Sequence, residues 1–496
     1  MKLAAIIQGT GARGDADLDA DIALVTGDSR AAVPGTLFFA LPGTEHDGHD
    51  FVPDAVRRGA LAVVAERKVP SAPAALLLAP SSRHAMAIAA ANFHGRPADA
   101  LPVVGVTGTN GKTTVAWLVE ACLRAAGVPA GLLGTVVHRW PGVERPARHT
   151  TPESTEIQAM LAAARAAGAR SAVLEVSSHA LAQERVAGIR FRAAGFTNLT
   201  RDHLDYHGDM ERYFGAKRRL FLEHLAPDGL AVVNVRDPWG ARLADQLGPG
   251  RRVWRYGGRA GDDLAAEDVV TGLSGTAGTL RTPKGPISFR SPLVGAHNLE
   301  NLLCAAGLAL ALEAPPAAIA RAFSDSKGAP GRLERFAARG VSVFVDYAHT
   351  DDALARALEV LRGAAPRRIV CVFGCGGDRD RGKRPLMGEV AARGADLVIV
   401  TSDNPRSEDP AAIIGEIVPG LERAGMMRLT SKLPLDERGF AIEPDRRSAI
   451  ALAVGAARDG DAVLVAGKGH EDQQIVGGER LPFSDRDEAR RALGLA

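Results

Sequence analysis

The chain lacks most of the features that mark secreted, membrane-bound or redox proteins. Its 496 residues contain only four cysteines, too few for a disulfide framework at this length. No apolar run approaches the ~18 residues of a membrane span, and the apolar run at the N-terminus is too short for a signal peptide. We therefore expect a soluble, cytoplasmic protein with reduced thiols and no membrane span.

An excess of one charge is also missing. The chain carries 60 basic and 58 acidic residues, for a net charge of +2. No long block of like charges interrupts this balance, which argues against a nucleic-acid partner, a basic arm or an acidic tail. The local basic cluster at residues 379–384 must therefore be explained by a local anion.

The length suggests about three domains, and three regions separate by pattern. Residues 1–98 mix short strands with alanine-rich helical stretches, and residues 99–331 alternate longer strands with helices. Residues 332–496 repeat an apolar strand followed by a polar loop. This alternation predicts an α/β fold with parallel sheets. We expect a smaller N-terminal α/β domain, a central parallel-sheet domain of the P-loop ATPase type and a Rossmann-like C-terminal domain.

The polar loops of the third region each follow a predicted strand. Ligands of parallel sheets bind at the carboxyl ends of the strands, so these loops should form one concave site. The strands are predicted at 341–345, 368–373, 397–401 and 462–466, and the loops at 346–349, 374–383, 402–410 and 467–471.

A glycine-rich loop follows the predicted strand at 103–106 and precedes a predicted helix. Such a loop points backbone N–H groups at phosphate, while Lys112 supplies a positive charge and Thr113 a hydroxyl for Mg²⁺. The usual nucleotide-loop spacing needs glycine where Val106 stands, which disfavours a common kinase or GTPase and favours a ligase-type variant. The alternative is a plain glycine turn. The nucleotide-binding residues are predicted to be Gly108, Thr109, Asn110, Gly111, Lys112, Thr113 and Thr114.

Three further residues near this loop carry chemistry. Glu175 ends a predicted strand of the same sheet, where a carboxylate can hold Mg²⁺. His203 lies in a polar stretch without the cysteine pair or histidine spacing of a zinc site. Lys217 lies on a predicted helix, and its chemistry alone indicates a solvated lysine.

Six motifs in order along nearly the whole chain resemble those of the Mur ligase family. Three fall in the central region and three in the C-terminal region. They are Glu175-Val176-Ser177-Ser178-His179, the stretch Thr197-Asn198-Leu199 to Asp202-His203-Leu204-Asp205-Tyr206-His207, Gly295-Ala296-His297-Asn298-Leu299-Glu300-Asn301, Gly331-Arg332-Leu333-Glu334, Asp346-Tyr347-Ala348-His349 and Gly467-Lys468-Gly469-His470-Glu471.

The resemblance implies an ATP-dependent ligase in which ATP phosphorylates a carboxylate, an amine attacks and phosphate leaves. Lys112 and Mg²⁺ would stabilise the charge on the transferred phosphoryl group. The resemblance implies that Lys217 is a carbamylated lysine. It also implies that Lys217, His203 and Lys112 form the catalytic set. Mg²⁺ would be held by Thr113, Glu175 and His203, and further ATP contacts would come from Asn298, Asn301, Arg332, Asp346 and His349.

The choice of amino acid is expected to lie in the third region. An arginine fork suits a carboxylate, and Arg406 follows a predicted strand within Asp403-Asn404-Pro405-Arg406. Arg384 adds a cation and Glu471 an anion for an ammonium group. This set suits meso-diaminopimelate better than lysine, and the motif resembles the diaminopimelate signature of the ligase that adds the third peptide residue. The alternative is a surface turn with solvated arginines. The predicted site is Arg384, Asp403, Asn404, Pro405, Arg406, Gly467 and Glu471.

By the same resemblance the acceptor is UDP-N-acetylmuramoyl-L-alanyl-D-glutamate. Three positions depart from the family pattern: His149 replaces a common asparagine, Asp351 a common proline and Gln473 a frequent tyrosine. The predicted acceptor site is Gly27, Ser29, Thr44, Glu45, His46, His149, Thr150, Thr151, Ser177, Gln183 and Arg185.

The resemblance further implies a monomer. Rival interpretations are a related ligase that adds lysine or another diamine, a folylpolyglutamate-type ligase, and the ligase that adds the terminal dipeptide. From other classes come a small-molecule kinase or simple ATPase and a non-catalytic nucleotide-binding protein.

Overall fold

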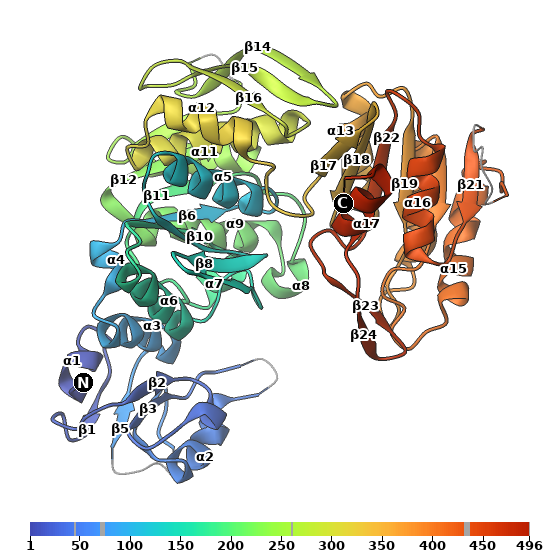
Figure 1. Ribbon diagram of the computed structural model, residues 1–496. Helices are drawn as coiled ribbons and strands as arrows, with labels where there is room; N and C mark the ends of the chain where they lie inside the picture. Colours follow the sequence, from blue (N-terminus) through green and yellow to red (C-terminus); the bar gives the residue numbers. More distant parts are fainter. Residues whose placement is uncertain (44–45, 70–74, 259–260, 431–436, 496) are drawn as a thin grey trace. The chain divides into compact units, whose positions relative to one another are not determined.

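The computed structural model describes residues 1–43, 46–69, 75–258, 261–430 and 437–495 (Figure 1). The chain forms two compact units. The first comprises Met1–Ala265, Arg281–Gly285 and Asn301–Ile319, and the second comprises Ala266–Leu280, Pro286–Glu300 and Ala320–Ala496. The N-terminal and central sheets both belong to the first unit, and the domain boundaries at 98 and 331 stay predictions. No helix of the described residues is long and apolar enough to cross a membrane.

The N-terminal sheet has the order β1-β5-β4-β3-β2 and is parallel except at β1. Its strands are short and apolar, and the side chains of Leu37, Phe39 and Val64 lie in its core. The strands are β1 (Arg13–Asp15), β2 (Leu24–Thr26), β3 (Thr36–Phe39), β4 (Ala60–Ala65) and β5 (Leu76–Leu78). The helical segments are α1 (Leu3–Ile7), η1 (Ser29–Ala31), η2 (Gly48–Phe51), α2 (Val52–Arg57), α3 (Ser82–Phe93) and α4 (Pro97–Ala100).

The central sheet has the order β13-β12-β11-β6-β10-β7-β8-β9, and only β8 and β9 run antiparallel to their neighbours. The inner strands read as nearly continuous apolar runs because helices cover both faces. The strands are β6 (Val103–Thr107), β7 (Ala130–Leu133), β8 (Val137–Trp140), β9 (Val143–Pro146), β10 (Ser171–Glu175), β11 (Phe191–Phe196), β12 (Leu225–Asn234) and β13 (Arg252–Tyr256).

Helix α5 lies on one face of this sheet, and α6, α7 and α9 lie on the other (Figure 1). The helix predicted after the glycine-rich loop corresponds to α5. The helical segments that follow the N-terminal sheet are α5 (Lys112–Ala125), α6 (Ser154–Ala166), α7 (Ser178–Ala182), α8 (Leu204–His207), α9 (Met210–Arg219), the π-helical turn η3 (Leu220–His224), α10 (Pro238–Leu247), α11 (Ala296–Ala311) and α12 (Pro316–Asp325).

The second unit contains a small sheet, β14 (Ala265–Gly272), β15 (Gly275–Arg281) and β16 (Ile287–Ser291), and a larger one. The larger sheet has the order β17-β18-β22-β19-β20-β21. Its strands are β17 (Glu334–Ala338), β18 (Val341–Asp346), β19 (Ile369–Phe373), β20 (Leu397–Val400), β21 (Gly439–Ile442) and β22 (Ala462–Ala466), and a hairpin of β23 (Gln473–Val476) and β24 (Glu479–Pro482) follows. Its helices are α13 (Asp351–Gly363), α14 (Lys383–Gly394), α15 (Pro410–Arg423), α16 (Arg446–Ala456) and α17 (Asp485–Leu493).

The four strands predicted for this region are adjacent and parallel, so their loops leave from the same edge, as expected. The prediction missed β17 and β21, which flank them. β17 pairs antiparallel with β18 through a tight turn, and β21 begins with a glycine and is short. The predicted α/β class with mostly parallel sheets is confirmed.

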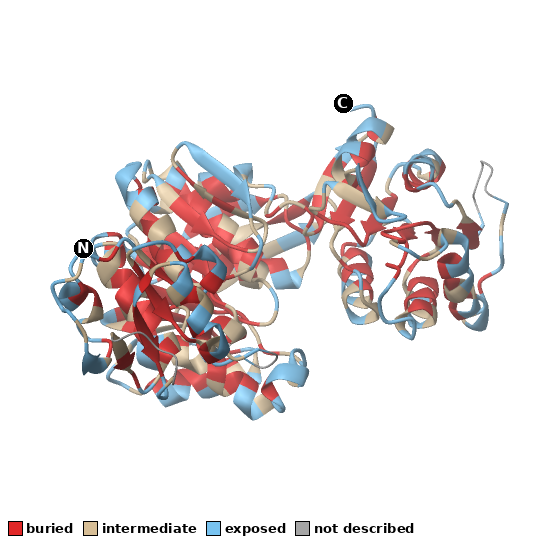
Figure 2. Cartoon of the chain, turned by 90° about the horizontal axis from the view of Figure 1, so that it is seen from below, coloured by how far each residue is buried: buried red, intermediate tan, exposed pale blue. Residues whose placement is uncertain are grey.

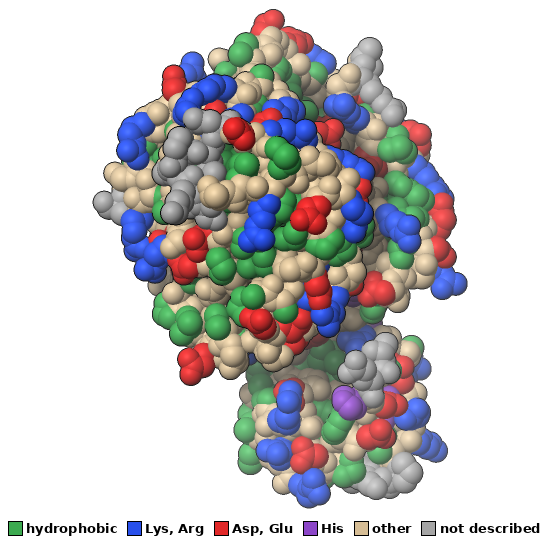
Figure 3. Space-filling model, turned by 90° about the vertical axis from the view of Figure 1, so that its right-hand side faces the viewer, with side chains coloured by type: hydrophobic (Ala, Val, Ile, Leu, Met, Phe, Trp, Pro, Cys, Tyr) green, Lys and Arg blue, Asp and Glu red, His purple; other side chains and the backbone are tan. Residues whose placement is uncertain are grey.

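Burial follows this architecture. Figure 2 shows buried residues in the strands and on the inner faces of the helices, with exposed residues on the outer helix faces. In the view of Figure 3, basic and acidic side chains are interspersed. This mixture agrees with the near-zero net charge.

Candidate active site

The glycine loop between β6 and α5 has the conformation that a phosphate loop needs. Gly108 and Gly111 have φ angles of 150° and 85°, which L side chains rarely adopt. A Cβ on Gly108 would lie 1.9 Å from the Thr197 Oγ1 atom. The loop can therefore pass close to β11 only because this position is glycine.

Two lysines meet at the carbonyl oxygen of Gly108. Lys112 Nζ donates to this oxygen and to the Thr109 oxygen, both at 2.9 Å, and Lys217 Nζ donates to it at 2.8 Å. Lys217 is only 1% exposed, so its interpretation as a solvated lysine is wrong. Burial, together with the nearby Lys112 charge, lowers the pKa of Lys217 well below its ordinary value. A neutral amine is the form that carbamylation requires, and the modification itself stays a prediction.

Glu175 ends β10 and is fully buried. Its Oε2 atom accepts from the Thr113 hydroxyl and from the Thr135 hydroxyl, each at 2.9 Å. Its Oε1 atom accepts from the Thr135 N–H at 2.8 Å. The phosphate-loop hydroxyl and the predicted metal carboxylate are thus in direct contact. Thr135 was not predicted, because its place depends on β7 lying beside β10.

His203 is placed differently from the other predicted metal ligands. Its φ angle is 52°, and its ring lies 4.8 Å from the ring of His179 and 6.1 Å from that of Tyr213. In the described parts of the chain, none of its contacts is with Thr113 or Glu175. Nor do those parts hold a cluster of three or more His, Cys, Asp or Glu side chains suited to a metal ion. The metal role of His203 stays a prediction.

The predicted acceptor residues of the central sheet are bonded to Glu175 and its partners. The Thr151 hydroxyl donates to the Glu175 backbone oxygen at 2.7 Å and accepts from the Ser177 N–H at 3.0 Å. The Thr135 hydroxyl contacts the Thr150 hydroxyl at 3.1 Å. The structure therefore brings Thr150, Thr151 and Ser177 to the same place as the phosphate loop.

Arg185 extends this cluster. Its guanidinium donates to the Thr151 backbone oxygen at 2.8 Å and to Gln183 Oε1 at 2.7 Å, and it forms an ion pair with Glu153 at 2.8 Å. The Gln183 amide in turn donates to the hydroxyl of Tyr206. His149, which directly precedes Thr150 and Thr151, is exposed.

The N-terminal part of the predicted acceptor site is only partly described. Ser29 is buried at the start of η1, which Asp28 caps through the N–H of Arg30. A Cβ on Gly27 would lie 2.8 Å from Leu41 Cδ1, and the His46 ring lies 6.3 Å from the ring of Phe51. Thr44 and Glu45 lie outside the described residues. Nucleotide contact by all of these residues stays a prediction.

The predicted ATP contacts beyond the phosphate loop fall in both units. A Cβ on Gly111 would lie 2.4 Å from Asn301 Oδ1, so Asn301 lies directly beside the loop. The Asn298 amide is buried and donates to the Val294 backbone oxygen at 2.9 Å.

In the second unit, Asp346 at the end of β18 accepts from the N–H groups of Leu333 and Ala348, at 2.7 and 2.9 Å. Burial raises its pKa. The Arg332 guanidinium lies 5.1 Å from the Tyr347 ring centre. His349 Nδ1 contacts the Tyr347 backbone oxygen at 2.9 Å.

The loops after β20 and β22 meet at the predicted amino-acid site. The Asn404 amide donates to Glu471 Oε2 at 3.0 Å. The Oδ1 atom of Asp403 is buried and accepts no hydrogen bond from the described residues. Arg406 has a φ angle of 53° and donates from Nη1 to the Gly377 oxygen at 2.7 Å. Pro405 and Gly467 complete the two loops, and Gly467 has a φ angle of 123°.

Arg384 is occupied by other partners. Its side chain is fully buried and forms a two-pronged ion pair with Glu408, at 2.8 and 2.9 Å, and a further one with Glu416 at 2.8 Å. The Arg384 charge and a backbone N–H lower the pKa of Glu408 to about 2. Sequence reasoning did not consider these glutamates. Contact between Arg384 and a ligand therefore stays a prediction and would require Glu408 to give way.

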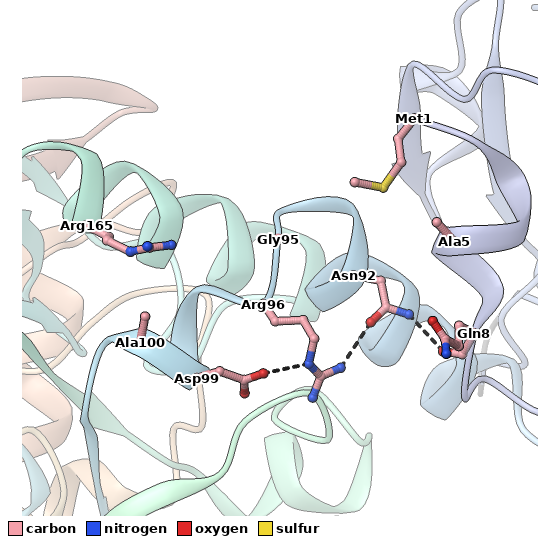
Figure 4. A pocket seen from close by; sticks show the side chains of 9 residues that line it. All are labelled: Met1, Ala5, Gln8, Asn92, Gly95, Arg96, Asp99, Ala100 and Arg165. Carbon is pink, nitrogen blue, oxygen red and sulfur yellow. Dashed lines mark hydrogen bonds and ion pairs between the residues drawn. The ribbon is translucent and has the colours of Figure 1, made fainter.

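A separate hollow of about 510 Å³ lies near the N-terminus (Figure 4). One of its two arginines, Arg96, already has partners: it donates to Asp99 at 2.8 Å and to Asn92 at 3.0 Å. No predicted site residue lines this hollow, so we do not regard it as the active site. Its lining residues are Met1, Ala5, Gln8, Asn92, Gly95, Arg96, Asp99, Ala100 and Arg165.

Comparison with known proteins agrees with the motifs. Three family models match the chain: the Mur ligase family catalytic domain at residues 21–94, the Mur ligase middle domain at 106–309, and the Mur ligase glutamate ligase domain at 331–469.

Full-length relatives agree as well. A protein of Geobacter metallireducens named UDP-N-acetylmuramoyl-L-alanyl-D-glutamate–2,6-diaminopimelate ligase is 50% identical over 94% of this chain and 93% of its own. The protein of the same name from Geobacter sulfurreducens is 48% identical over 99% of this chain and 98% of its own. A solved structure with that name matches at a TM-score of 0.76 and 33% identity, covering 100% of this chain and 99% of the other. The chain therefore belongs to the Mur ligase family.

Proposed function

We propose that this protein couples meso-diaminopimelate to UDP-N-acetylmuramoyl-L-alanyl-D-glutamate, with ATP as co-substrate, in peptidoglycan precursor synthesis. One observation carries the proposal. Glu175 contacts the phosphate-loop Thr113 through its carboxylate and the acceptor-side Thr151 through its backbone oxygen, at 2.9 and 2.7 Å. Phosphoryl transfer to a carboxylate needs both groups at one place. The names of the full-length relatives support the choice of substrates.

The chemistry follows from the weakness of a carboxylate as an electrophile. An oxygen of the acceptor carboxylate attacks the γ-phosphorus of ATP, ADP leaves, and an acyl phosphate forms. The amine of the amino acid then attacks the acyl carbon and loses a proton. The bond between this carbon and the bridging oxygen breaks, and phosphate leaves with the former carboxylate oxygen. Lys112 lies at the phosphate loop, where its ammonium would neutralise the charge on the transferred group.

Thr113 and Glu175 also fit a magnesium ion, because both present oxygen atoms and Mg²⁺ prefers oxygen ligands. When bound, Mg²⁺ would neutralise phosphate charge. The two threonines that bond to Glu175 orient its carboxylate. We place the reaction in the cytoplasm, with a monomeric enzyme.

Replacing Gly134 with alanine tests this arrangement. A Cβ at Gly134 would lie 2.2 Å from Glu175 Oε1, so the carboxylate must shift. We expect kcat to fall by about 100-fold, because small displacements of reacting groups are costly. Steady-state phosphate release measures the effect. The control is Gly215→Ala on α9, where a Cβ would meet nothing within 4 Å. Full activity of Gly134→Ala would show that the position of Glu175 is not critical.

The selection of diaminopimelate is proposed to lie with Asp403, Asn404, Arg406 and Glu471. The Asp403 Oδ1 atom, which accepts no hydrogen bond from the described residues, and the Glu471 carboxylate can accept from an ammonium group. Arg406 Nη1 donates a hydrogen bond to the Gly377 oxygen. The other N–H groups of its guanidinium can donate to a ligand carboxylate. Lysine lacks the distal carboxylate, so it would leave this arginine without a ligand partner.

Omission of single substrates separates the proposal from its rivals. We expect phosphate release only when ATP, the UDP-linked acceptor and diaminopimelate are all present. With the acceptor carboxylate labelled by a heavy oxygen isotope, one labelled oxygen should appear in the released phosphate. Phosphate release from ATP alone would indicate a simple ATPase. A phosphorylated acceptor that no amine consumes would indicate a kinase.

A further inference from the structure

Lys468 is a buried cation at the amino-acid loops, the two loops that follow β20 and β22. Its side chain is fully buried. Its Nζ atom donates to Asn404 Oδ1 at 3.0 Å and to Glu471 Oε2 at 3.1 Å, and lies 3.9 Å from Asp403 Oδ1. A buried charge is costly unless it is paired and hydrogen-bonded. Among the described residues, the polar partners of this ammonium all belong to the proposed diaminopimelate site.

The contacts close a triangle. The Asn404 amide donates to the same Glu471 Oε2 atom at 3.0 Å, and its Oδ1 also accepts from the Ile475 N–H at 3.0 Å. With the amide reversed, its NH₂ group would face two donors and its oxygen would face a carboxylate. Lys468 and Ile475 therefore fix the orientation of Asn404. Glu471 is held by one oxygen, which leaves Oε1 outside the triangle.

We propose that Lys468 is a positioning residue for the amino-acid site. It holds the Glu471 carboxylate and the Asn404 amide in the orientation that receives the ligand's ammonium group. The inference rests on the proposed function, because it assumes that these loops bind diaminopimelate.

The charges near Lys468 indicate that it positions Glu471 and does not compete with the ligand for this carboxylate. Lys468 faces two carboxylates, Asp403 and Glu471. The buried Arg446 close to them is itself paired with Asp485, so these two carboxylates keep negative charge for a ligand. Without Lys468 the two carboxylates would repel each other. Glu471 is about a third exposed, at 32%, and its side chain would turn toward solvent. A ligand would then have to order Glu471 and Asn404 on binding.

Lys468→Met tests the role with a side chain of similar length and no charge. We expect the diaminopimelate KM to rise by about 10-fold, with the ATP KM and kcat within about 3-fold of wild type. The control is Lys327→Met, at an exposed lysine of the same unit. A lower amino-acid KM would overturn the proposal, because Lys468 would then compete with the ligand for Glu471. An unchanged amino-acid KM, or equal rises in both KM values, would overturn it as well.

A double-mutant cycle separates positioning from general destabilisation. If Lys468 acts through Glu471, adding Lys468→Met to Glu471→Gln should change the amino-acid KM by only about 2-fold. Independent, multiplying effects would contradict the proposal. Should Lys468→Met fail to fold, Lys468→Arg keeps the charge but not its geometry, and it should raise the amino-acid KM alone.

Calorimetric titration of diaminopimelate into the full-length protein reads the same site without turnover. A wild-type protein that binds the amino acid but releases no phosphate would overturn the proposed function. The affinity comparison with Lys468→Met would still decide the positioning role. The expected affinity loss is again about 10-fold.

Discussion

Replacing Lys217 with alanine should lower kcat by about 1,000-fold, the upper end of the loss expected when one preorganised polar group is removed from a reaction site. The side chain is buried beside the phosphate loop, and its Nζ atom donates to the Gly108 oxygen at 2.8 Å. Phosphate release under saturating substrates measures the effect. Lys68→Ala, at an exposed lysine of the same unit, should keep wild-type kcat. A Lys217→Ala variant within about 3-fold of wild type would contradict the role.

The carbamylation of Lys217 has a separate readout. Burial and the nearby Lys112 charge lower the pKa of Lys217 well below its ordinary value, which favours the neutral, nucleophilic amine. With isotopically labelled bicarbonate, we expect a carbamate signal by NMR in wild type and in Lys68→Ala, but not in Lys217→Ala. Absence of the signal from wild type would exclude the modification and leave the amine itself as the active group.

Arg406→Ala should raise the diaminopimelate KM by about 10- to 100-fold, the range expected for lost hydrogen bonds to a charged group. The ATP KM should not change, because Arg406 contacts Gly377 and Asn404 of the amino-acid loops. Selectivity for diaminopimelate over lysine should fall in parallel. Arg393→Ala is the matched control, since Arg393 is exposed on α14 and pairs only with Glu389 in the described residues. A parallel rise in the ATP KM would show that Arg406 does not select the amino acid.

The phosphate loop could be predicted because its signal is local. A strand, a glycine loop and a helix follow one another within about twenty residues, as in other phosphate loops. The four loop-bearing strands of the second unit were also visible, since each is an apolar run ended by polar residues. The flanking strands β17 and β21 were missed because β17 begins with two charged residues and β21 begins with a glycine, which weakens the apolar pattern of each.

The burial of Lys217 could not be predicted from its surroundings in the sequence. Helix α9 contains a glutamate, three arginines and this lysine, a composition typical of an exposed helix. Only the tertiary contact with the Gly108 carbonyl places the side chain inside. The resemblance to the Mur ligases predicted a catalytic role for Lys217, whereas the composition of the helix predicted an exposed lysine.

The partners of charged groups were equally hidden. Sequence reasoning placed Arg384 in the amino-acid site as a further cation, but Glu408 and Glu416 already bind it in the structure. Thr135 and Lys468 were given no role, because Thr135 contacts Glu175 and Lys468 contacts Asn404, both of which are distant in the sequence. For each of these residues, function depends on which loops adjoin in the folded sheet.

The most direct test of the central claim is a competition in one reaction. The protein is incubated with ATP, the UDP-linked acceptor and equal concentrations of meso-diaminopimelate and lysine. The masses of the products are then measured by mass spectrometry. We predict almost exclusively the diaminopimelate adduct, with one phosphate released for each amide bond formed. Equal amounts of the two adducts, or phosphate without any adduct, would contradict the account.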